Sequence, residues 1–285
     1  MPNDLDVWLA ETEQQIPNIR PDTAKRIVWA GVAGEKTPLA VVYLHGFSAS
    51  SAEIRPVPER VAAALGANLF LTRLAGHGRD GVAMAEPVAG DWINDLDEAM
   101  AIARRLGDRV ILIGTSTGGT LAALAATDAR FNDGLAGVVL ISPNFGLRPL
   151  AARILDLPLA RYWGPLVAGA ERSFTPLNAE HARFWTTAYP TSALFPLAAL
   201  MRHARGLEYS RAAAPALVIY NGADQVIDPA RIAPVIDQWG GPVTVEQVSL
   251  GPGDDRYGHV IAGDILSPGL TEPVVARITG WARGL

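Results

Sequence analysis

Apolar positions along the chain follow two alternating patterns. Short, mostly apolar runs predict strands buried on both faces of a sheet, and stretches in which apolar residues recur every three or four positions predict helices. The predicted strands are 26–30, 39–44, 68–71, 109–113, 135–141, 216–220 and 243–250. The predicted helices are 4–16, 54–65, 91–106, 121–126, 229–239 and 272–283. This alternation favours an α/β fold with a mostly parallel sheet, flanking helices and right-handed crossovers.

The alternation is interrupted between residues 144 and 212. Six prolines and nine aromatic residues fall in this stretch, which has short helical patches and no convincing buried strand. A structureless loop of such length is uncommon inside a compact domain. We therefore expect 144–212 to be a small helical cap, inserted into an α/β core that 1–143 and 213–285 form together.

Composition narrows the class of protein. The 285 residues are 49% apolar and 19% charged, which allows a sizeable core, and the net charge of −5 offers no basic surface to nucleic acid. Disulfides, thiolate nucleophiles and cysteine metal sites are excluded because the chain has no cysteine. The N-terminal residues are acidic, unlike a signal peptide, and no apolar run reaches the roughly 18 residues that span a bilayer. We expect a soluble, cytoplasmic protein without stable membrane insertion.

The stretch Gly114-Thr115-Ser116-Thr117-Gly118 stands between a predicted strand and a predicted helix. It fits the G-x-S-x-G pattern of a nucleophile elbow, in the strand–turn–helix context that the pattern requires. The glycines permit a tight turn that leaves the serine pointing away from the backbone at a helix N-terminus. The alternative interpretation is an ordinary glycine-rich turn.

A serine hydroxyl is a poor nucleophile unless a base takes its proton, and histidine is the base expected near neutral pH. Ligands bind at the carboxyl ends of the strands in open α/β sheets, and His259 is the only histidine after the last predicted strand. We therefore favour His259 as the base. His45 and His77 lie in turns with glycine, where we expect structural roles. His181 and His203 are expected on helix surfaces within the insertion.

The base needs an acidic side chain that fixes its tautomer and stabilises its cation. Asp224 comes directly after a predicted strand and a glycine, whereas Asp228 precedes Pro229 and is expected to cap the helix beginning there. We favour Asp224 over Asp228. Three aspartates share the loop of His259, are badly placed to reach the far nitrogen of its ring, and are interpreted as solvated charges: Asp254, Asp255 and Asp264.

An oxyanion hole requires two backbone N–H groups aimed at the atom where negative charge develops. Thr117 directly follows the serine at a helix N-terminus and is the natural first donor. Phe47 comes after His45-Gly46, at the end of a strand expected beside the elbow strand, and is the natural second donor. The alternative interpretation of His45-Gly46 is a simple turn.

Taken together, five motifs resemble the α/β-hydrolase superfamily and are most similar to its monoacylglycerol lipase and carboxylesterase branch. They are His45-Gly46-Phe47, Gly76-His77-Gly78, Gly114-Thr115-Ser116-Thr117-Gly118-Gly119, Gly222-Ala223-Asp224 and Gly258-His259. The resemblance extends over nearly the whole chain from about Arg26. Two features depart from it. Position 117 is threonine, where many relatives have methionine or glutamine, and the loop before His259 is long and carries two aspartates.

The resemblance implies a triad of Ser116, Asp224 and His259, with Phe47 and Thr117 as oxyanion donors and a helical lid at 144–212. The chain order serine, aspartate, histidine is the order of α/β-hydrolase triads. The expected reaction is two-step acyl transfer on a small-molecule ester through an acyl-enzyme, and it requires no metal and no cofactor.

Other functions stay open because a fold does not determine a reaction. Serine hydrolases of other bonds include C–C hydrolases, peptidases and acyltransferases, and a hydrolase homologue that only binds a ligand is a further alternative. Dehalogenases and epoxide hydrolases are disfavoured, because they use a carboxylate nucleophile. The cap is either purely structural or contributes aromatic side chains to an apolar acyl pocket, for which the candidates are Phe145, Trp163, Phe174 and Trp185.

Overall fold

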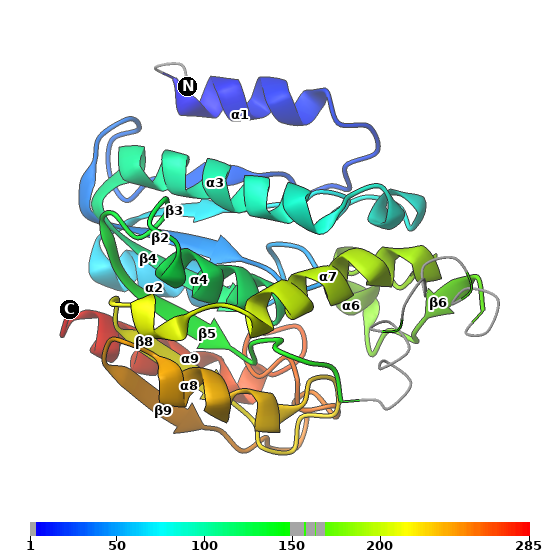
Figure 1. Ribbon diagram of the computed structural model, residues 1–285. Helices are drawn as coiled ribbons and strands as arrows, with labels where there is room; N and C mark the ends of the chain where they lie inside the picture. The colour runs from blue at the N-terminus through cyan, green and yellow to red at the C-terminus, as the bar shows by residue number, and fades with distance from the viewer. Residues whose placement is uncertain (1–3, 149–156, 158–162, 164–168) are drawn as a thin grey trace.

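Seven strands form one central sheet in the computed structural model, which describes residues 4–148, 157, 163 and 169–285 (Figure 1). The strands are β1 (Arg26–Val28), β2 (Thr37–Leu44), β3 (Asn68–Leu71), β4 (Gly107–Thr115), β5 (Leu135–Ile141), β8 (Ala216–Tyr220) and β9 (Val243–Gln247). Their order is β1-β3-β2-β4-β5-β8-β9. Neighbouring strands run parallel except for β1 and β3, so the predicted mostly parallel sheet is confirmed.

Helices cover both faces of the sheet (Figure 1). One face packs against α2 (Val57–Leu65) and α9 (Pro268–Ala282), and the other packs against α3 (Ala89–Leu106), α4 (Thr117–Thr127), α7 (Leu194–Arg205) and α8 (Ala233–Gln238). The helix α1 (Leu5–Gln14) lies beside β1. Short 3-10 turns occur at Val82–Ala85, Thr191–Ala193, Tyr209–Arg211 and Pro229–Arg231. Across the described residues, no helix combines the length and apolar character needed to cross a bilayer.

Side chains of β2 alternate between the two hydrophobic cores. Val42 and Leu44 belong to the core beneath α3 and α4, whereas Val41 and Tyr43 belong to the core beneath α2 and α9. Successive side chains of a strand point to opposite faces of the sheet, so a central strand that is covered on both sides must be apolar throughout. This burial explains why the strand appears in the sequence as an uninterrupted apolar run.

The last helix begins earlier than predicted, at a proline. α9 begins at Pro268, not near Glu272, and it contains Pro273. Proline is tolerated in the first helical turn, where its missing N–H has no partner within the helix. Pro268 therefore opens a helical turn that the sequence pattern assigned to a loop, whereas Pro273 lies within the predicted helix.

The chain between β5 and β8 contains, among the described residues, α6 (Ala179–Phe184), α7 and an antiparallel ribbon of β6 (Glu171–Ser173) and β7 (Ala188–Pro190). The ribbon gave no sequence signal because its strands are short and β6 is exposed. Figure 1 places β6 and α6 beyond the end of the sheet toward which the arrow of β5 points. The amide of Thr186 donates to the carbonyl of Ser48 (2.7 Å), which ties this segment to the loop after β2.

Candidate active site

Ser116 occupies a strained turn between β4 and α4. Its φ and ψ are 52° and −113°, a region that non-glycine residues rarely adopt. A Cβ at Gly114 would collide with the backbone of Gly118, and a Cβ at Gly118 would collide with the carbonyl of Leu44. The turn is held by the Ser116 amide, which donates to Ile141 O on the neighbouring strand (2.9 Å). This is the geometry that the G-x-S-x-G pattern predicted for a nucleophile elbow.

Asp224 and His259 meet at the same edge of the sheet. Asp224 follows β8 and His259 follows β9, and the distance from His259 Nδ1 to Asp224 Oδ2 is 2.8 Å. Asp224 is fully buried, and its second oxygen, Oδ1, accepts from the amides of Val226 (2.7 Å) and Ile227 (3.0 Å). The carboxylate therefore holds the proton of the imidazole on Nδ1 and leaves Nε2 as the nitrogen able to accept one.

Opposing effects set the pKa of His259. Burial lowers the pKa, but the hydrogen bond and charge of Asp224 raise it, assisted by the charges of Glu53 and Asp255, and the net pKa lies above the usual value for histidine. The imidazolium ion is thus stabilised in a buried position, as a base that accepts a proton during a reaction requires.

The loop of His259 is organised by Asp255. Its Oδ2 atom accepts from the amides of His259 and Val260 (3.0 Å each), and its Oδ1 atom accepts from the amide of Tyr257 (3.0 Å). Asp255 is only 5% exposed, so its interpretation as a solvated charge is wrong. Three amide donors replace the hydrogen bonds to water that the carboxylate loses on burial. Asp264 is exposed, as expected.

Asp228 has the role that its sequence position predicted. Its side chain accepts from the amide of Ala230 (3.1 Å) at the start of the 3-10 turn that precedes α8. It is therefore a helix cap, and among these two candidates Asp224 is the one in contact with His259.

The loop of His45-Gly46-Phe47 lies against the elbow. The parallel register pairs Leu44 on β2 with Gly114 on β4, so the two strands end side by side. A Cβ at Gly46 would lie 3.2 Å from Ser116 Cβ. Among the described residues, neither Phe47 nor Thr117 donates a hydrogen bond from its amide. Two free amide donors thus flank Ser116, one in the loop after β2 and the other at the first residue of α4.

Two of the other four histidines have the structural roles expected of them. Nε2 of the buried His45 accepts from the amide of Leu74 (3.0 Å), so Nδ1 carries the proton and donates to Gly46 O (2.9 Å). Nδ1 of His77 lies 3.0 Å from Ala75 O, and burial lowers the pKa of His77 to about 4.

The two histidines of the insertion differ from each other. His203 is exposed on α7, as predicted. The prediction of a surface position is wrong for His181, which is only 7% exposed because its ring packs between Phe174 (5.5 Å between centroids) and Trp185 (4.7 Å).

The four aromatic candidates for an acyl pocket lie in different parts of the structure and differ in burial. Trp185 is buried and, with Phe174, flanks His181. Phe145 is buried in the core beneath α4, with its ring centroid 6.0 Å from that of Tyr209. Trp163 is half-buried. Their contribution to a pocket stays a prediction.

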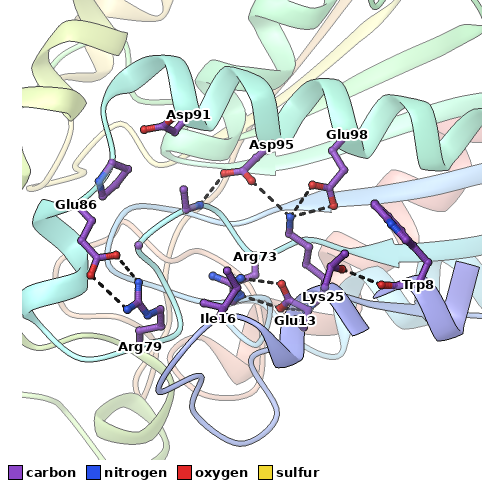
Figure 2. Close-up of a pocket in the computed structure, with 14 residues that line it drawn as sticks. Trp8, Glu13, Ile16, Lys25, Arg73, Arg79, Glu86, Asp91, Asp95 and Glu98 are labelled. Atoms are coloured by element: carbon purple, nitrogen blue, oxygen red, sulfur yellow. Dashed lines mark hydrogen bonds and ion pairs between the residues drawn. The ribbon is translucent and has the colours of Figure 1, made fainter. Parts of the chain in front are cut away.

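A cavity of about 390 Å³ lies apart from these groups, between α1, α3 and the loop after β3 (Figure 2). Most of its charged side chains form ion pairs with one another, among them Glu13 with Arg73 (2.7 Å), Lys25 with Glu98 (2.9 Å) and Arg79 with Glu86. None of the predicted site residues lines this cavity.

Sequence reasoning missed a buried glutamate beside Ser116. Glu53 is 2% exposed, and its Oε2 atom accepts from the amide of Gly46 (2.7 Å) and from the hydroxyl of Tyr43 (2.8 Å). Burial raises the pKa of Glu53 to about 7, against the opposing effects of these two donors and of His259. The available signal was a single acidic residue in an otherwise uncharged stretch after the strand that ends at Leu44.

Both the family comparison and the sequence comparison relate this chain to hydrolases. Residues 35–245 match the family model of the serine aminopeptidase family S33. A thermostable monoacylglycerol lipase of Bacillus sp. (strain H-257) is 27% identical over 198 residues, which are 68% of this chain and 74% of that protein.

Solved structures share the fold across almost the whole chain. A metagenome-derived lipolytic enzyme superposes with a TM-score of 0.76 at 22% identity, covering 94% of this chain and 100% of its own. The monoacylglycerol lipase of Paleococcus ferrophilus superposes with a TM-score of 0.66 at 18% identity, covering 91% of this chain and 98% of its own. These similarities identify the fold as that of the α/β hydrolases, as the motifs predicted.

Proposed function

The chain belongs to the serine aminopeptidase S33 family of α/β hydrolases, and on that premise we propose that it is a serine carboxylic-ester hydrolase. Its substrates are small esters with apolar acyl chains, of which monoacylglycerols are the first candidates because two similar proteins are monoacylglycerol lipases. The family and the fold make the chain a lipase-like or esterase-like hydrolase, and the serine mechanism is the further step proposed here.

The observation that carries this proposal is the hydrogen bond of 2.8 Å between His259 Nδ1 and Asp224 Oδ2. A buried aspartate that orients an imidazole is the arrangement that activates a serine nucleophile. The strained turn at Ser116 supports it, because such strain persists only where the surrounding structure enforces it, as at the turn of a nucleophile elbow. An aspartate–histidine pair without a nucleophile at the same edge of the sheet would suggest only a structural contact.

In the proposed reaction, Ser116 Oγ attacks the ester carbonyl while His259 Nε2 takes its proton. The carbonyl oxygen becomes negatively charged and accepts hydrogen bonds from the amides of Phe47 and Thr117. His259 then returns the proton to the leaving alcohol. Water, activated by the same imidazole, cleaves the acyl-enzyme and regenerates the serine.

Residues 144–212 act in this proposal as a cap on the core of 1–143 and 213–285. The bond from Thr186 to Ser48 supports it, and so does the contact between the rings of Phe47 and Tyr189, whose centroids are 5.3 Å apart. A cap that touches the loop of Phe47 is close enough to the reacting atoms to contribute to the binding of the acyl chain.

The test combines a variant with a chemical probe. Ser116→Ala should abolish hydrolysis of a p-nitrophenyl ester without unfolding the protein, and a fluorophosphonate should label Ser116 of the parent, as mapped by peptide mass spectrometry. Ser51→Ala is the matched control, since Ser51 is also buried and should leave both readouts unchanged. An alanine variant at position 116 that turns over the ester at the parental rate would refute the assignment.

A substrate panel distinguishes the ester hydrolase from its alternatives. Monoacylglycerols, p-nitrophenyl esters and amino-acyl arylamides should be compared at equal enzyme concentration. Faster turnover of the arylamides would favour a peptidase, in agreement with the description of the family model. Absence of labelling and of turnover in the native protein would favour a ligand-binding homologue.

A further inference from the structure

The peptide groups on both sides of Gly46 are held by buried side chains. The Gly46 amide donates to Glu53 Oε2 (2.7 Å), and the Gly46 carbonyl accepts from His45 Nδ1 (2.9 Å). That carbonyl belongs to the same planar peptide group as the Phe47 amide, and in a trans peptide the two point in opposite directions. The direction of the Phe47 N–H is therefore determined by how Gly46 is held.

Glu53 connects this loop to β4, the strand that ends directly before Ser116. Its Oε2 atom also accepts from the Tyr43 hydroxyl (2.8 Å), and the oxygen of that hydroxyl lies 3.2 Å from Thr115 Oγ1. Thr115 directly precedes Ser116. A continuous series of hydrogen-bonding groups thus runs from the end of β4 through Tyr43 and Glu53 to the Gly46 amide.

The carboxyl group and the nucleophile lie on the same side of Gly46. A Cβ at Gly46 would lie 2.6 Å from Glu53 Oε1 and 3.2 Å from Ser116 Cβ. The second carboxyl oxygen and the serine therefore both border the space beside Gly46, and a small displacement of the loop would shift the Gly46 backbone relative to Ser116. Buried hydrogen bonds of this kind lock a loop because each group left unpaired would be costly.

Building on the serine hydrolase proposed above, we propose that Glu53 is a positioning residue for the oxyanion hole. By binding the Gly46 amide and the Tyr43 hydroxyl together, it fixes the peptide group before Gly46. With His45 holding the Gly46 carbonyl, this sets both sides of Gly46 and so the direction in which Phe47 N–H faces the developing oxyanion. Glu53 does not touch the reacting atoms in this role, and its effect passes through Gly46.

The test compares Glu53→Ala, which removes the acceptor, with Glu53→Gln, whose amide oxygen keeps one acceptor for Gly46. Loss of a complete oxyanion donor lowers kcat by 10²- to 10³-fold in other hydrolases, so a displaced donor should lower kcat of Glu53→Ala by about 10- to 100-fold. KM should stay within about twofold, since the donor acts in the transition state. Glu53→Gln should recover most of kcat. Ser51→Ala, a buried serine in the same loop, is the matched control.

Inhibition by a trifluoromethyl ketone distinguishes a positioning role from a purely structural one. The inhibitor forms an anionic adduct with the serine, and the oxyanion hole stabilises this anion. Its inhibition constant should rise by the same factor as kcat falls. The proposal is overturned by a folded Glu53→Ala variant with parental kcat, by a change confined to KM, or by a Glu53→Gln variant as impaired as Glu53→Ala.

Two further measurements separate this proposal from the proposed function. A parent that hydrolyses no ester and takes no fluorophosphonate label contradicts the hydrolase, whereas a labelled, active parent with an equally active Glu53→Ala variant contradicts only the role of Glu53. Hydrogen–deuterium exchange of residues 44–50 measures the opening of the loop directly and does not depend on turnover. Exchange should be faster in Glu53→Ala than in the parent and in Ser51→Ala, and unchanged exchange would refute the positioning role.

Discussion

Arg20 binds Trp185, although the two residues are far apart in the sequence: Nη1 of the arginine donates a hydrogen bond to the backbone carbonyl of the tryptophan (2.9 Å). The same guanidinium group donates to Arg183 O (3.0 Å) and to Thr186 Oγ1 (3.0 Å). Because the Thr186 amide binds Ser48 O, the segment before β1 is connected through residues 183–186 to the loop of Phe47.

Arg20→Ala should therefore destabilise the protein and loosen this segment. Three hydrogen bonds from a charged group are lost, and we expect a decrease of about 1–3 kcal/mol in the free energy of unfolding. Urea denaturation measures the decrease, and hydrogen–deuterium exchange should rise at residues 180–190. Arg130→Ala is the control, because its bonds to Asp128 are local and exposed. Equal effects of the two substitutions would contradict the connection.

Asp224→Asn should nearly abolish turnover while leaving the fold intact. An asparagine cannot hold the Nδ1 proton of His259, and the comparable change in a serine protease lowers kcat by roughly 10⁴-fold. Asp228→Asn is the paired control, since Asp228 caps a 3-10 turn, and kcat should stay within about threefold of the parent. Similar losses in both variants would show that the acid has been assigned incorrectly.

The rate should rise with pH through the pKa of His259. The base must be neutral to accept the proton of Ser116, and the net pKa of His259 lies above its usual value, because Asp224, Glu53 and Asp255 outweigh burial. The acid limb of kcat/KM should thus have its midpoint above about 6.5. Initial rates between pH 5 and 9 on a neutral ester measure it, with initial rates on Asp255→Asn as the comparison. That variant should have a lower midpoint, and a higher one would contradict the electrostatic explanation.

Glu53 should make the folded state less stable as the pH rises. Burial raises its pKa from 4.5 to about 7, so the folded state holds the proton more tightly than the unfolded state does. The associated stability is present below pH 4.5 and is lost as the pH passes 7, a change of about 3 kcal/mol. The groups facing Glu53 are the Gly46 amide, Tyr43 and His259.

Glu53→Gln removes this titration. Urea denaturation at pH 5 and pH 8 should therefore show a smaller loss of stability in the variant than in the parent or in Ser51→Ala. An identical loss in all three proteins would mean that Glu53 does not titrate in this interval.

Trp185→Ala should change the preference for acyl chain length if the cap lines the acyl site. Relative rates on p-nitrophenyl esters of increasing chain length measure the preference. Trp163→Ala is the second test, and Trp8→Ala is the control because Trp8 lines the separate cavity beside α1. Unchanged profiles in both test variants would leave the cap with a structural role only.

The sequence pointed to the parts of the candidate site that depend on local geometry or on strand ends. Ser116 could be found because the flanking glycines are needed wherever a strand turns directly into a helix. Asp224 and His259 could be found because parallel strands bring their carboxyl ends to one edge, so residues far apart in the chain become neighbours.

Glu53 and Asp255 could not be predicted in the same way. Their partners include the backbone amides of Gly46, His259 and Val260, and an amide leaves no trace in the sequence. Their burial depends on the path of each loop, which the apolar pattern does not determine. His181 was misplaced for a related reason, since its burial arises from contacts with Phe174 and Trp185 and not from the pattern of its own helix.

The lack of space at Gly46 restricts which residues can replace it during evolution. Glu53 Oε1 and Ser116 Cβ occupy the region into which any side chain at this position would project. In a saturation library selected for ester turnover, glycine alone should persist at position 46. Gly31, which has no heavy atom within 4 Å of its own projected Cβ, should tolerate many substitutions. Ser116, the proposed nucleophile, thereby constrains a residue that would take no chemical part in the reaction.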